Sequence, residues 1–156
     1  MNKFDLNNKN AIITGGAQGF GLDIAKRFLK SGANVFIWDS DKEELKKASK
    51  FISDQNLSCD VVDVSDPKNV NDVVSKITSK TKIDILINNA GITGSTAELW
   101  NYNYEEWKKI IDINLHGTFN CCKSIVPHMI KNNYGRIVNI ASVSGKDGNA
   151  KASAYS

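Results

Sequence analysis

Three glycines near the start of the chain have the spacing of a phosphate-binding turn. They are Gly15, Gly19 and Gly21 in the segment TGGAQGFG, which reads T-G-x-x-x-G-x-G and fits G-x-G-x-x-G in no frame. Gly15 permits a tight turn, and Gly19 lets the backbone approach a pyrophosphate at a helix N-terminus, where free N–H groups favour an anion. Gly21 allows the helix to pack closely on a sheet. A glycine segment alone also fits a plain structural turn, so the function depends on its context.

Asp39 supplies that context as a second contact for a nucleotide. It ends an apolar run 18 positions after Gly21. A carboxylate there accepts hydrogen bonds from both ribose hydroxyls of NAD and repels the 2′-phosphate of NADP, and no Arg or Lys stands in its place. We therefore predict NAD rather than NADP as the cofactor. The alternative is that Asp39 caps the next helix, with Ser40 and Asp41 beside it.

The glycines and Asp39 need strands and helices to position them, and the hydrophobic pattern predicts both. Short β-branched runs alternate with amphipathic stretches. The predicted strands are 10–14, 34–38, 57–62, 83–87 and 136–141, and the predicted helices are 19–31, 41–53, 66–80 and 104–131. Pro67 marks a helix start, whereas Pro127 should kink or interrupt the long helix. This alternation predicts an α/β fold with helices on both faces of a parallel sheet.

Composition excludes several other classes of function. The chain has 156 residues, 41% of them apolar, and a net charge of +3, with lysines interleaved with acids as in DKEELKKASK. This pattern is typical of a solvated surface and does not favour nucleic acid. We expect no membrane span and no secretory leader, since the apolar runs are too short. The three cysteines form no zinc spacing and no even disulfide framework, which predicts a cytoplasmic protein with reduced thiols and no metal.

Further motifs make the sequence resemble the short-chain dehydrogenase/reductase family. The glycine segment is followed by Asp63-Val64, by NNAG (88–91), by Asn114 in DINLHGTF, by Ser142 in IVNIAS, and by Tyr155 thirteen residues after Ser142. Their order and spacing cover nearly the whole chain and look most like 3-oxoacyl-carrier-protein-reductase-like members and related sugar-acid or alcohol dehydrogenases. The resemblance implies a Rossmann-type doubly wound parallel sheet with strand order 3-2-1-4-5. It also implies a homo-oligomer, either a tetramer or a dimer.

The same resemblance implies the residues that bind the cofactor. They are Gly15, Gln18, Gly19, Phe20, Gly21, Asp39, Asp63, Val64, Asn89, Ala90 and Gly91. Phe20 stands where the family often has isoleucine, beside the pyrophosphate turn. Asp63 and Val64 would hold the adenine through a side chain and a backbone group. Asn88 and Asn89 could equally brace the edge of the sheet.

The catalytic residues implied by the resemblance are Asn114, Ser142 and Tyr155. Tyr155 would be the general acid in carbonyl reduction and the general base in alcohol oxidation, and Ser142 would hydrogen-bond the substrate oxygen. Asn114 would support a chain of waters to solvent, or could instead be a residue at a helix kink. His116 and His128 fall on the long helix, away from the strand ends, and are expected to be structural. Trp100 and Tyr102 could line a substrate pocket or form a staple at the start of the long helix.

The family pattern continues past the end of this sequence. A free phenol has a pKa of about 10, too high for a base near neutral pH. The family lowers it with a lysine four residues after the tyrosine, which would be position 159, beyond Ser156. The pattern gives neither Lys146 nor Lys151 that role. We therefore interpret residues 1–156 as a single dinucleotide-binding domain, the N-terminal part of a longer single-domain enzyme, with an exposed apolar edge at the fifth strand.

The expected function is an NAD-dependent oxidoreductase. It would transfer a hydride between nicotinamide and a small-molecule secondary alcohol or ketone of sugar-acid, hydroxy-acid or 3-oxoacyl type. The alternative is a catalytically inactive nucleotide-binding fragment or interaction module that lacks the active-site lysine. A third interpretation, an NADPH-dependent 3-oxoacyl reductase, is opposed by Asp39.

Overall fold

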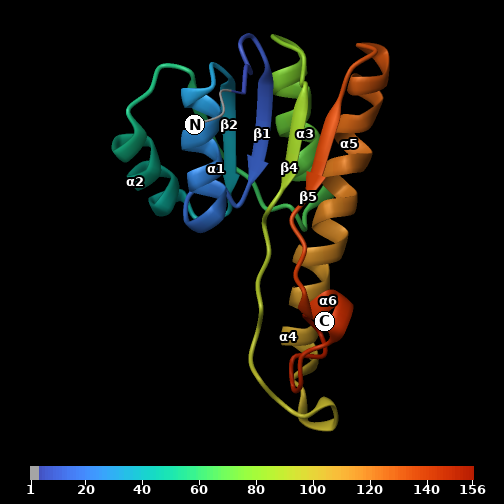
Figure 1. Ribbon diagram of the computed structural model, residues 1–156. Helices are drawn as coiled ribbons and strands as arrows, with labels where there is room; N and C mark the ends of the chain where they lie inside the picture. The colour runs from blue at the N-terminus through green and yellow to red at the C-terminus, as the bar shows by residue number, and fades with distance from the viewer. Residues whose placement is uncertain (1–3) are drawn as a thin grey trace.

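The computed structural model describes residues 4–156, and its centre is a five-stranded parallel sheet (Figure 1). The strands are β1 (Asn10–Thr14), β2 (Asn34–Asp39), β3 (Leu57–Val61), β4 (Ile85–Asn88) and β5 (Arg136–Asn139). They lie in the order β3-β2-β1-β4-β5, and every neighbouring pair is parallel. The predicted Rossmann-type strand order 3-2-1-4-5 is therefore confirmed.

Helices cover both faces of this sheet. They are α1 (Gly19–Lys30), α2 (Lys42–Ile52), α3 (Pro67–Thr78), α4 (Tyr104–Ile111), α5 (Gly117–Lys131) and α6 (Ser144–Asp147). Helices α1 and α2 cover one face and α3 and α5 the other, while α4, α6 and the loop after β4 extend past the carboxyl ends of the strands (Figure 1). The carboxyl edge is therefore enclosed by chain from both halves of the sequence.

The central strand β1 shows why a sheet of this kind forms. Ala11 and Ile13 pack into the core under α1 and α2, whereas Ile12 between them packs into the core under α3 and α5. All three side chains are fully buried. A strand with both faces covered must be apolar at every position, and alternation of side chains sends successive residues to opposite cores.

Side-chain caps begin two of the helices near the predicted positions. The Asp41 carboxylate accepts the backbone N–H groups of Glu43 and Glu44 at 2.9 and 3.0 Å and so caps α2. Asp66 caps α3 in the same way, and Pro67 occupies the first helical turn, where no N–H is needed. Such caps satisfy N–H groups that the helix itself leaves unpaired.

The long helical pattern differs from its prediction at one point. A π-helical turn, Asp112–His116, separates α4 from α5, and α5 then continues through Pro127 to Lys131 without interruption. The predicted interruption at Pro127 is therefore wrong. Ile125 and Met129, on either side of the proline, are both buried in the core under α3 and α5, and this burial outweighs the one lost hydrogen bond.

The edges of the sheet also depart slightly from the predicted bounds. Strand β4 spans Ile85–Asn88 rather than 83–87, and just before it the Asp84 carboxylate accepts the backbone N–H of Asn10 at 2.9 Å. Strand β5 ends at Asn139 rather than at residue 141. Its partner in β4 at that position is Asn88, the last residue of β4. All four residues of β5 are exposed, as expected for an apolar edge strand. Within residues 4–156, no helix has the length and apolar character that crossing a bilayer requires.

Candidate functional site

Two adjacent cavities lie at the carboxyl edge of the sheet. The first, of about 410 Å³, is lined by the glycine turn and by the ends of β2 and β3. The second, of about 770 Å³, is lined by the π-helical turn, the end of β5 and the C-terminal segment. Both are lined by Phe20 and by the segment 89–92, so they form one continuous cleft. Open α/β sheets bind ligands at this edge.

The cleft gathers nearly all the residues predicted from the sequence. The first cavity is lined by Gly15, Gln18, Phe20, Asp39, Asp63, Val64, Asn89, Ala90 and Gly91. The second is lined by Asn114, Ser142 and Tyr155, together with Lys146, to which the sequence pattern assigned no role. Gly19 and Gly21 line neither cavity and act through the shape of the turn.

Each glycine of the turn has a distinct steric reason. Gly15 has a φ of +60°, and a Cβ there would lie 2.9 Å from the Cα of Ala90. At Gly21 a Cβ would lie 2.2 Å from the carbonyl oxygen of Gly15, so this glycine packs against the turn itself as well as against the sheet. Gly19, with a φ of +54°, would direct a Cβ into open space. Gly15 and Gly21 therefore close the turn, and Gly19 leaves its outer side free for a ligand.

The N-terminus of α1 suits an anion. Its N-cap, Gln18, makes no side-chain capping hydrogen bond, and no acidic residue lies in the first turn. The N–H groups at the start of that turn and the positive end of the helix dipole therefore meet no competing carboxylate from the turn itself. This donor set fits the pyrophosphate of a dinucleotide.

Thr14 and Asn89 hold the glycine turn against the end of β4. The Thr14 hydroxyl accepts the backbone N–H groups of Asn89 and Ala90, each at 3.0 Å. The Asn89 side chain in return donates to the carbonyl oxygens of Thr14 and Gly15, both at 3.0 Å. Asn89 therefore braces the cleft, whereas buried Asn88 links β4 to β5 through Asn139 at 2.8 Å. Sequence reasoning assigned no role to Thr14, although a polar residue ending an apolar strand was a visible signal.

The Asp39 carboxylate is oriented by backbone donors at the end of β2. One oxygen accepts the N–H of Ala17 in the glycine turn at 3.3 Å, and the other accepts the N–H of Asp41 at 3.1 Å. The α2 cap is Asp41, so the alternative that Asp39 caps this helix does not hold. Each oxygen keeps a lone pair for a further donor, such as a ribose hydroxyl.

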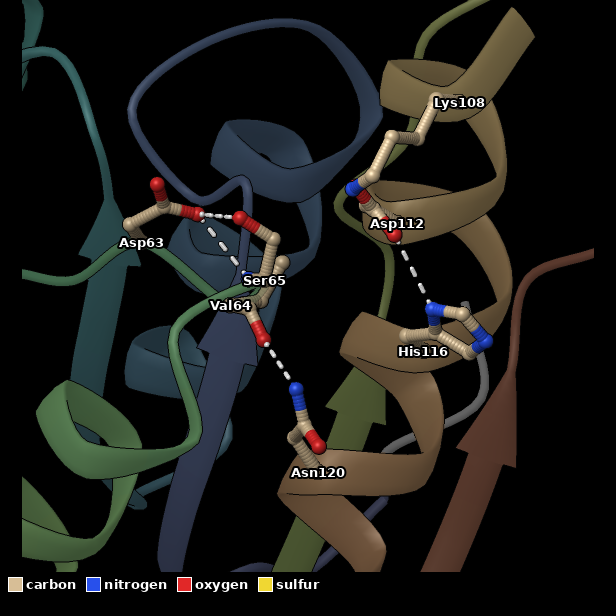
Figure 2. Close-up of polar contacts among 7 residues, drawn as sticks. All are labelled: Asp63, Val64, Ser65, Lys108, Asp112, His116 and Asn120. Carbon is tan, nitrogen blue, oxygen red and sulfur yellow. Dashed lines mark hydrogen bonds and ion pairs between the residues drawn. The ribbon is translucent and has the colours of Figure 1, made fainter.

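Asp63 and Val64, in the loop between β3 and α3, line the first cavity. Hydrogen bonds within this loop and to α5 hold them in place (Figure 2). One oxygen of Asp63 accepts both the backbone N–H and the hydroxyl of Ser65, at 2.9 and 2.7 Å. The carbonyl of Val64 accepts the side-chain N–H of Asn120 at 3.0 Å. The second Asp63 oxygen makes no hydrogen bond to any residue in the described 4–156 range and remains available to a ligand.

Asn114 joins the π-helical turn to the loop after β4. Its side chain donates to the carbonyl of Ile92 and accepts the N–H of Ile92, both at 2.9 Å. This reciprocal pair fixes the lining of the second cavity. The widened helical turn that presents Asn114 matches the helix-kink alternative, and such turns occur often at functional sites. A role in a water chain stays a prediction.

Lys108, Asp112 and His116 lie four residues apart along the same helical segment, and Asp112 pairs with both of the others (Figure 2). Lys108 pairs with one oxygen of Asp112, and the Nδ1 of His116 lies 3.0 Å from the other. Hydrogen bonds from Lys108 and His116 hold the pKa of the Asp112 carboxyl below its usual value. His116 thus belongs to a helix-supporting pair, and neither it nor His128 lines the cleft.

Ser142, in the segment after β5, and Tyr155, in the last turn of the chain, line the same cavity. The Ser142 oxygen accepts the backbone N–H of Ser144 at 3.2 Å, which leaves the hydroxyl proton of Ser142 free to be donated. Half-buried Tyr155 follows buried Ala154 in the C-terminal turn. The N–H of Ala97 bonds the carbonyl of Lys151 at 2.9 Å and so ties the loop after β4 to that turn. Two hydroxyl groups therefore face one cavity.

Trp100 and Tyr102 lie outside this cleft. Trp100 is exposed, and the Tyr102 ring packs edge-on against Trp107 with centroids 5.8 Å apart. Asn103 caps α4 by accepting the N–H of Glu106 at 2.9 Å. Tyr102 precedes the cap and Trp107 lies in the next turn, which is the arrangement of a hydrophobic staple. The staple alternative therefore holds for Tyr102.

The tight fit at Gly21 predicts a loss of cofactor affinity in Gly21→Ala. The added Cβ would lie 2.2 Å from the Gly15 carbonyl oxygen, so the turn must open. We expect the free energy of unfolding to fall by about 1–3 kcal/mol, as for other overpacked sites. Urea denaturation and NAD titration would measure both effects. Gly145→Ala is the control, because a Cβ there meets nothing within 4 Å. Equal behaviour of the two variants would contradict the fit.

Known proteins are similar to this chain over most of its length. The profile of the short chain dehydrogenase family matches residues 9–156. A 2-dehydro-3-deoxy-L-rhamnonate dehydrogenase (NAD(+)) of Sphingomonas sp. (strain SKA58) is 43% identical over 147 residues, which are 94% of this chain and 58% of that protein. The 3-oxoacyl-acyl-carrier-protein reductase FabG of Chlamydia muridarum (strain MoPn / Nigg) is 41% identical over 152 residues, 95% of this chain and 61% of that protein. The chain thus spans about three fifths of the length of these relatives.

Solved structures are similar over the same range. NAD+-bound xylitol dehydrogenase superposes with a TM-score of 0.91 and 33% identity, covering 97% of this chain and 60% of that one. The 3-ketoacyl-(acyl-carrier-protein) reductase of Brucella melitensis, complexed with NADH, superposes with a TM-score of 0.90 and 32% identity, covering 97% of this chain and 64% of that one. The fold, the glycine turn and the family match over residues 9–156 together show that the chain belongs to the short chain dehydrogenase family.

Proposed function

We propose that this chain is the cofactor-binding part of an NAD-dependent oxidoreductase that interconverts a secondary alcohol and a ketone. The observation that carries the proposal is the shared cleft. A carboxylate positioned for a ribose lies in one cavity, and two hydroxyl side chains, Ser142 and Tyr155, lie in the adjoining one. A dinucleotide is the ligand that needs both a nucleotide site and a reaction site joined in this way.

Residues of the first cavity would hold the nucleotide. The N–H groups of the first turn of α1 would bind the pyrophosphate, Asp39 the adenosine ribose, and Asp63 with Val64 the adenine. Bound NAD supplies a hydride acceptor, and NADH supplies a hydride donor. The chain itself contributes orientation and electrostatics. The side chains of Thr14 and Asn89 serve the orientation, because they hold the glycine turn through hydrogen bonds to backbone groups.

Residues of the second cavity would move the proton. The free hydroxyl proton of Ser142 would bond the substrate oxygen and orient it. Tyr155 would donate its proton to that oxygen when a ketone is reduced and would accept the proton when an alcohol is oxidised. Asn114 would keep the loop at Ile92 in place beneath the substrate through its two hydrogen bonds.

Asp39 and the relatives support NAD as the preferred cofactor. The Asp39 carboxylate would lie against the 2′-phosphate of NADP, and like charges at contact distance repel. The rhamnonate dehydrogenase is an NAD(+) enzyme by name, and the two solved structures hold NAD+ and NADH. The substrate would be a sugar acid, a hydroxy acid or a 3-oxoacyl compound.

Exposed apolar side chains support assembly into a homo-oligomer. Leu115, Phe119 and Ile130 on the helical segment from the π-helical turn to the end of α5 are 60%, 58% and 73% exposed. Apolar surface of this extent on one helix is typical of an interface between protein chains. We propose a dimer or a tetramer.

The experiment that tests the proposal is a change of cofactor preference in Asp39→Asn. This variant removes the charge and keeps one acceptor oxygen for the N–H of Ala17. We expect the ratio of the NADP to the NAD dissociation constant to fall by about 10- to 100-fold, because a partly exposed charge repulsion of roughly 1.4–2.7 kcal/mol is removed. Calorimetric titration of both nucleotides gives the ratio.

Asp23→Asn is the matched control, because Asp23 lies exposed on α1 and lines neither cavity. An unchanged ratio in Asp39→Asn would reject the assignment of Asp39 to the ribose. NAD binding by the wild-type chain without any turnover would favour the alternative function, a nucleotide-binding module.

A further inference from the structure

We propose that Lys146 binds a carboxylate on the substrate, so that the cleft selects acids over neutral alcohols and ketones. This inference rests on the proposed function, because it concerns the substrate of the same site. It adds a specificity-determining residue to the pair of hydroxyl groups described above.

The proposal is supported by the charges of the residues that line the second cavity. Among the described residues that line it, Lys146 alone carries a charge at neutral pH; the rest are apolar, amide or hydroxyl residues. None of the ion pairs formed among residues 4–156 includes Lys146, whereas Lys151 pairs with Glu98 at 3.4 Å. Lys146 is exposed, and a cation that lines a cavity raises the local concentration of anions there.

One short turn connects Lys146 to the reaction site. The N–H of Gly145 bonds the carbonyl of Ser142 at 3.0 Å, and the N–H of Lys146 bonds the carbonyl of Val143 at 3.0 Å. The Ser142 hydroxyl oxygen also accepts the N–H of Ser144 in the same turn. Because Ser142 and Lys146 line the same cavity, a substrate whose oxygen lies at Ser142 shares that cavity with Lys146. A lysine ammonium binds a carboxylate as a point charge on a flexible stem, without one demanded geometry.

The position of Lys146 indicates that its anionic partner belongs to the substrate rather than to the cofactor. Lys146 lines the second cavity and not the first, where the α1 N-terminus and Asp39 lie. The phosphates of a dinucleotide already have the N–H groups of α1 as partners. The geometry thus points to an anionic group on the substrate.

A matched pair of ligands tests the inference by binding alone. Acetoacetate and methyl acetoacetate carry the same ketone and differ in the charge of the carboxyl group. Ligand-detected NMR titrations would be run on the wild-type chain with saturating NAD. We expect acetoacetate to bind about five- to tenfold more tightly than its ester, the effect of one charge-assisted contact. Lys146→Met should remove this preference, and Lys146→Arg should retain most of it.

Lys151→Met serves as the matched control, because Lys151 is near in sequence but lies outside the cavity lining. It should keep the preference for the acid. The inference is overturned if the wild type binds both probes equally or neither, or if Lys151→Met loses the preference as fully as Lys146→Met. It is also overturned if Lys146→Met weakens NAD itself by the same factor, since the anion would then belong to the cofactor. Failure of the proposed function appears separately, as a wild-type chain that does not bind NAD.

Discussion

Tyr155→Phe is expected to lower the turnover of the proposed reaction by about 10²- to 10⁴-fold, the usual contribution of a positioned general acid or base. The substitution keeps the ring and removes only the hydroxyl of a residue that lines the second cavity. Because Tyr155 does not line the first cavity, the affinity for NAD should stay within about twofold. Absorbance of NADH measures turnover, and calorimetric titration measures the affinity.

Tyr134→Phe is the matched control for Tyr155. The Tyr134 ring lies against Lys9 and Arg136, away from the cleft, and its hydroxyl has no hydrogen bond among the described residues 4–156. It should keep full turnover. If Tyr155→Phe retained more than about a tenth of the wild-type rate, a different group would have to move the proton.

Thr14→Val is expected to be the most destabilising conservative substitution in the cleft. Thr14 is 2% exposed, and its hydroxyl is the acceptor for two backbone N–H groups, those of Asn89 and Ala90. Valine has the same shape but no acceptor, so both donors lose their partner. Each unsatisfied buried donor costs about 1–3 kcal/mol, and we expect a total loss of about 2–4 kcal/mol in the free energy of unfolding. Urea denaturation monitored by circular dichroism would measure it.

Thr14→Ser separates the hydroxyl from the methyl group. Serine keeps the acceptor and loses only one buried methyl, which costs about 1 kcal/mol. Affinity for the cofactor should likewise fall more in Thr14→Val than in Thr14→Ser, because the two N–H groups position the segment that both cavities share. If Val and Ser at position 14 gave equal stability, the Thr14 bonds would not hold the glycine turn.

The sequence by itself determined the scaffold and most of the nucleotide side of the cleft. Local patterns sufficed there: β-branched runs such as NAIIT specify buried strands, Asp66-Pro67 specifies a helix start, and the glycines of TGGAQGFG tolerate the positive φ angles that the turn needs. The parallel strand order followed from strand–helix alternation together with the family resemblance. Each of these signals lies within a few residues along the chain.

Only the tertiary structure decided the features that depend on contacts between distant segments. Pro127 stays inside a helix because Ile125 and Met129 are buried against elements far away in sequence. Thr14 holds Asn89 across 75 positions, and Asn114 holds Ile92 across 22. Among residues 4–156, Lys146 is the one charged residue that lines its cavity, because the loop after β4, the π-helical turn and the C-terminal segment converge there. Such roles arise from burial and from the absence of a partner, and the folded arrangement of the whole chain decides both.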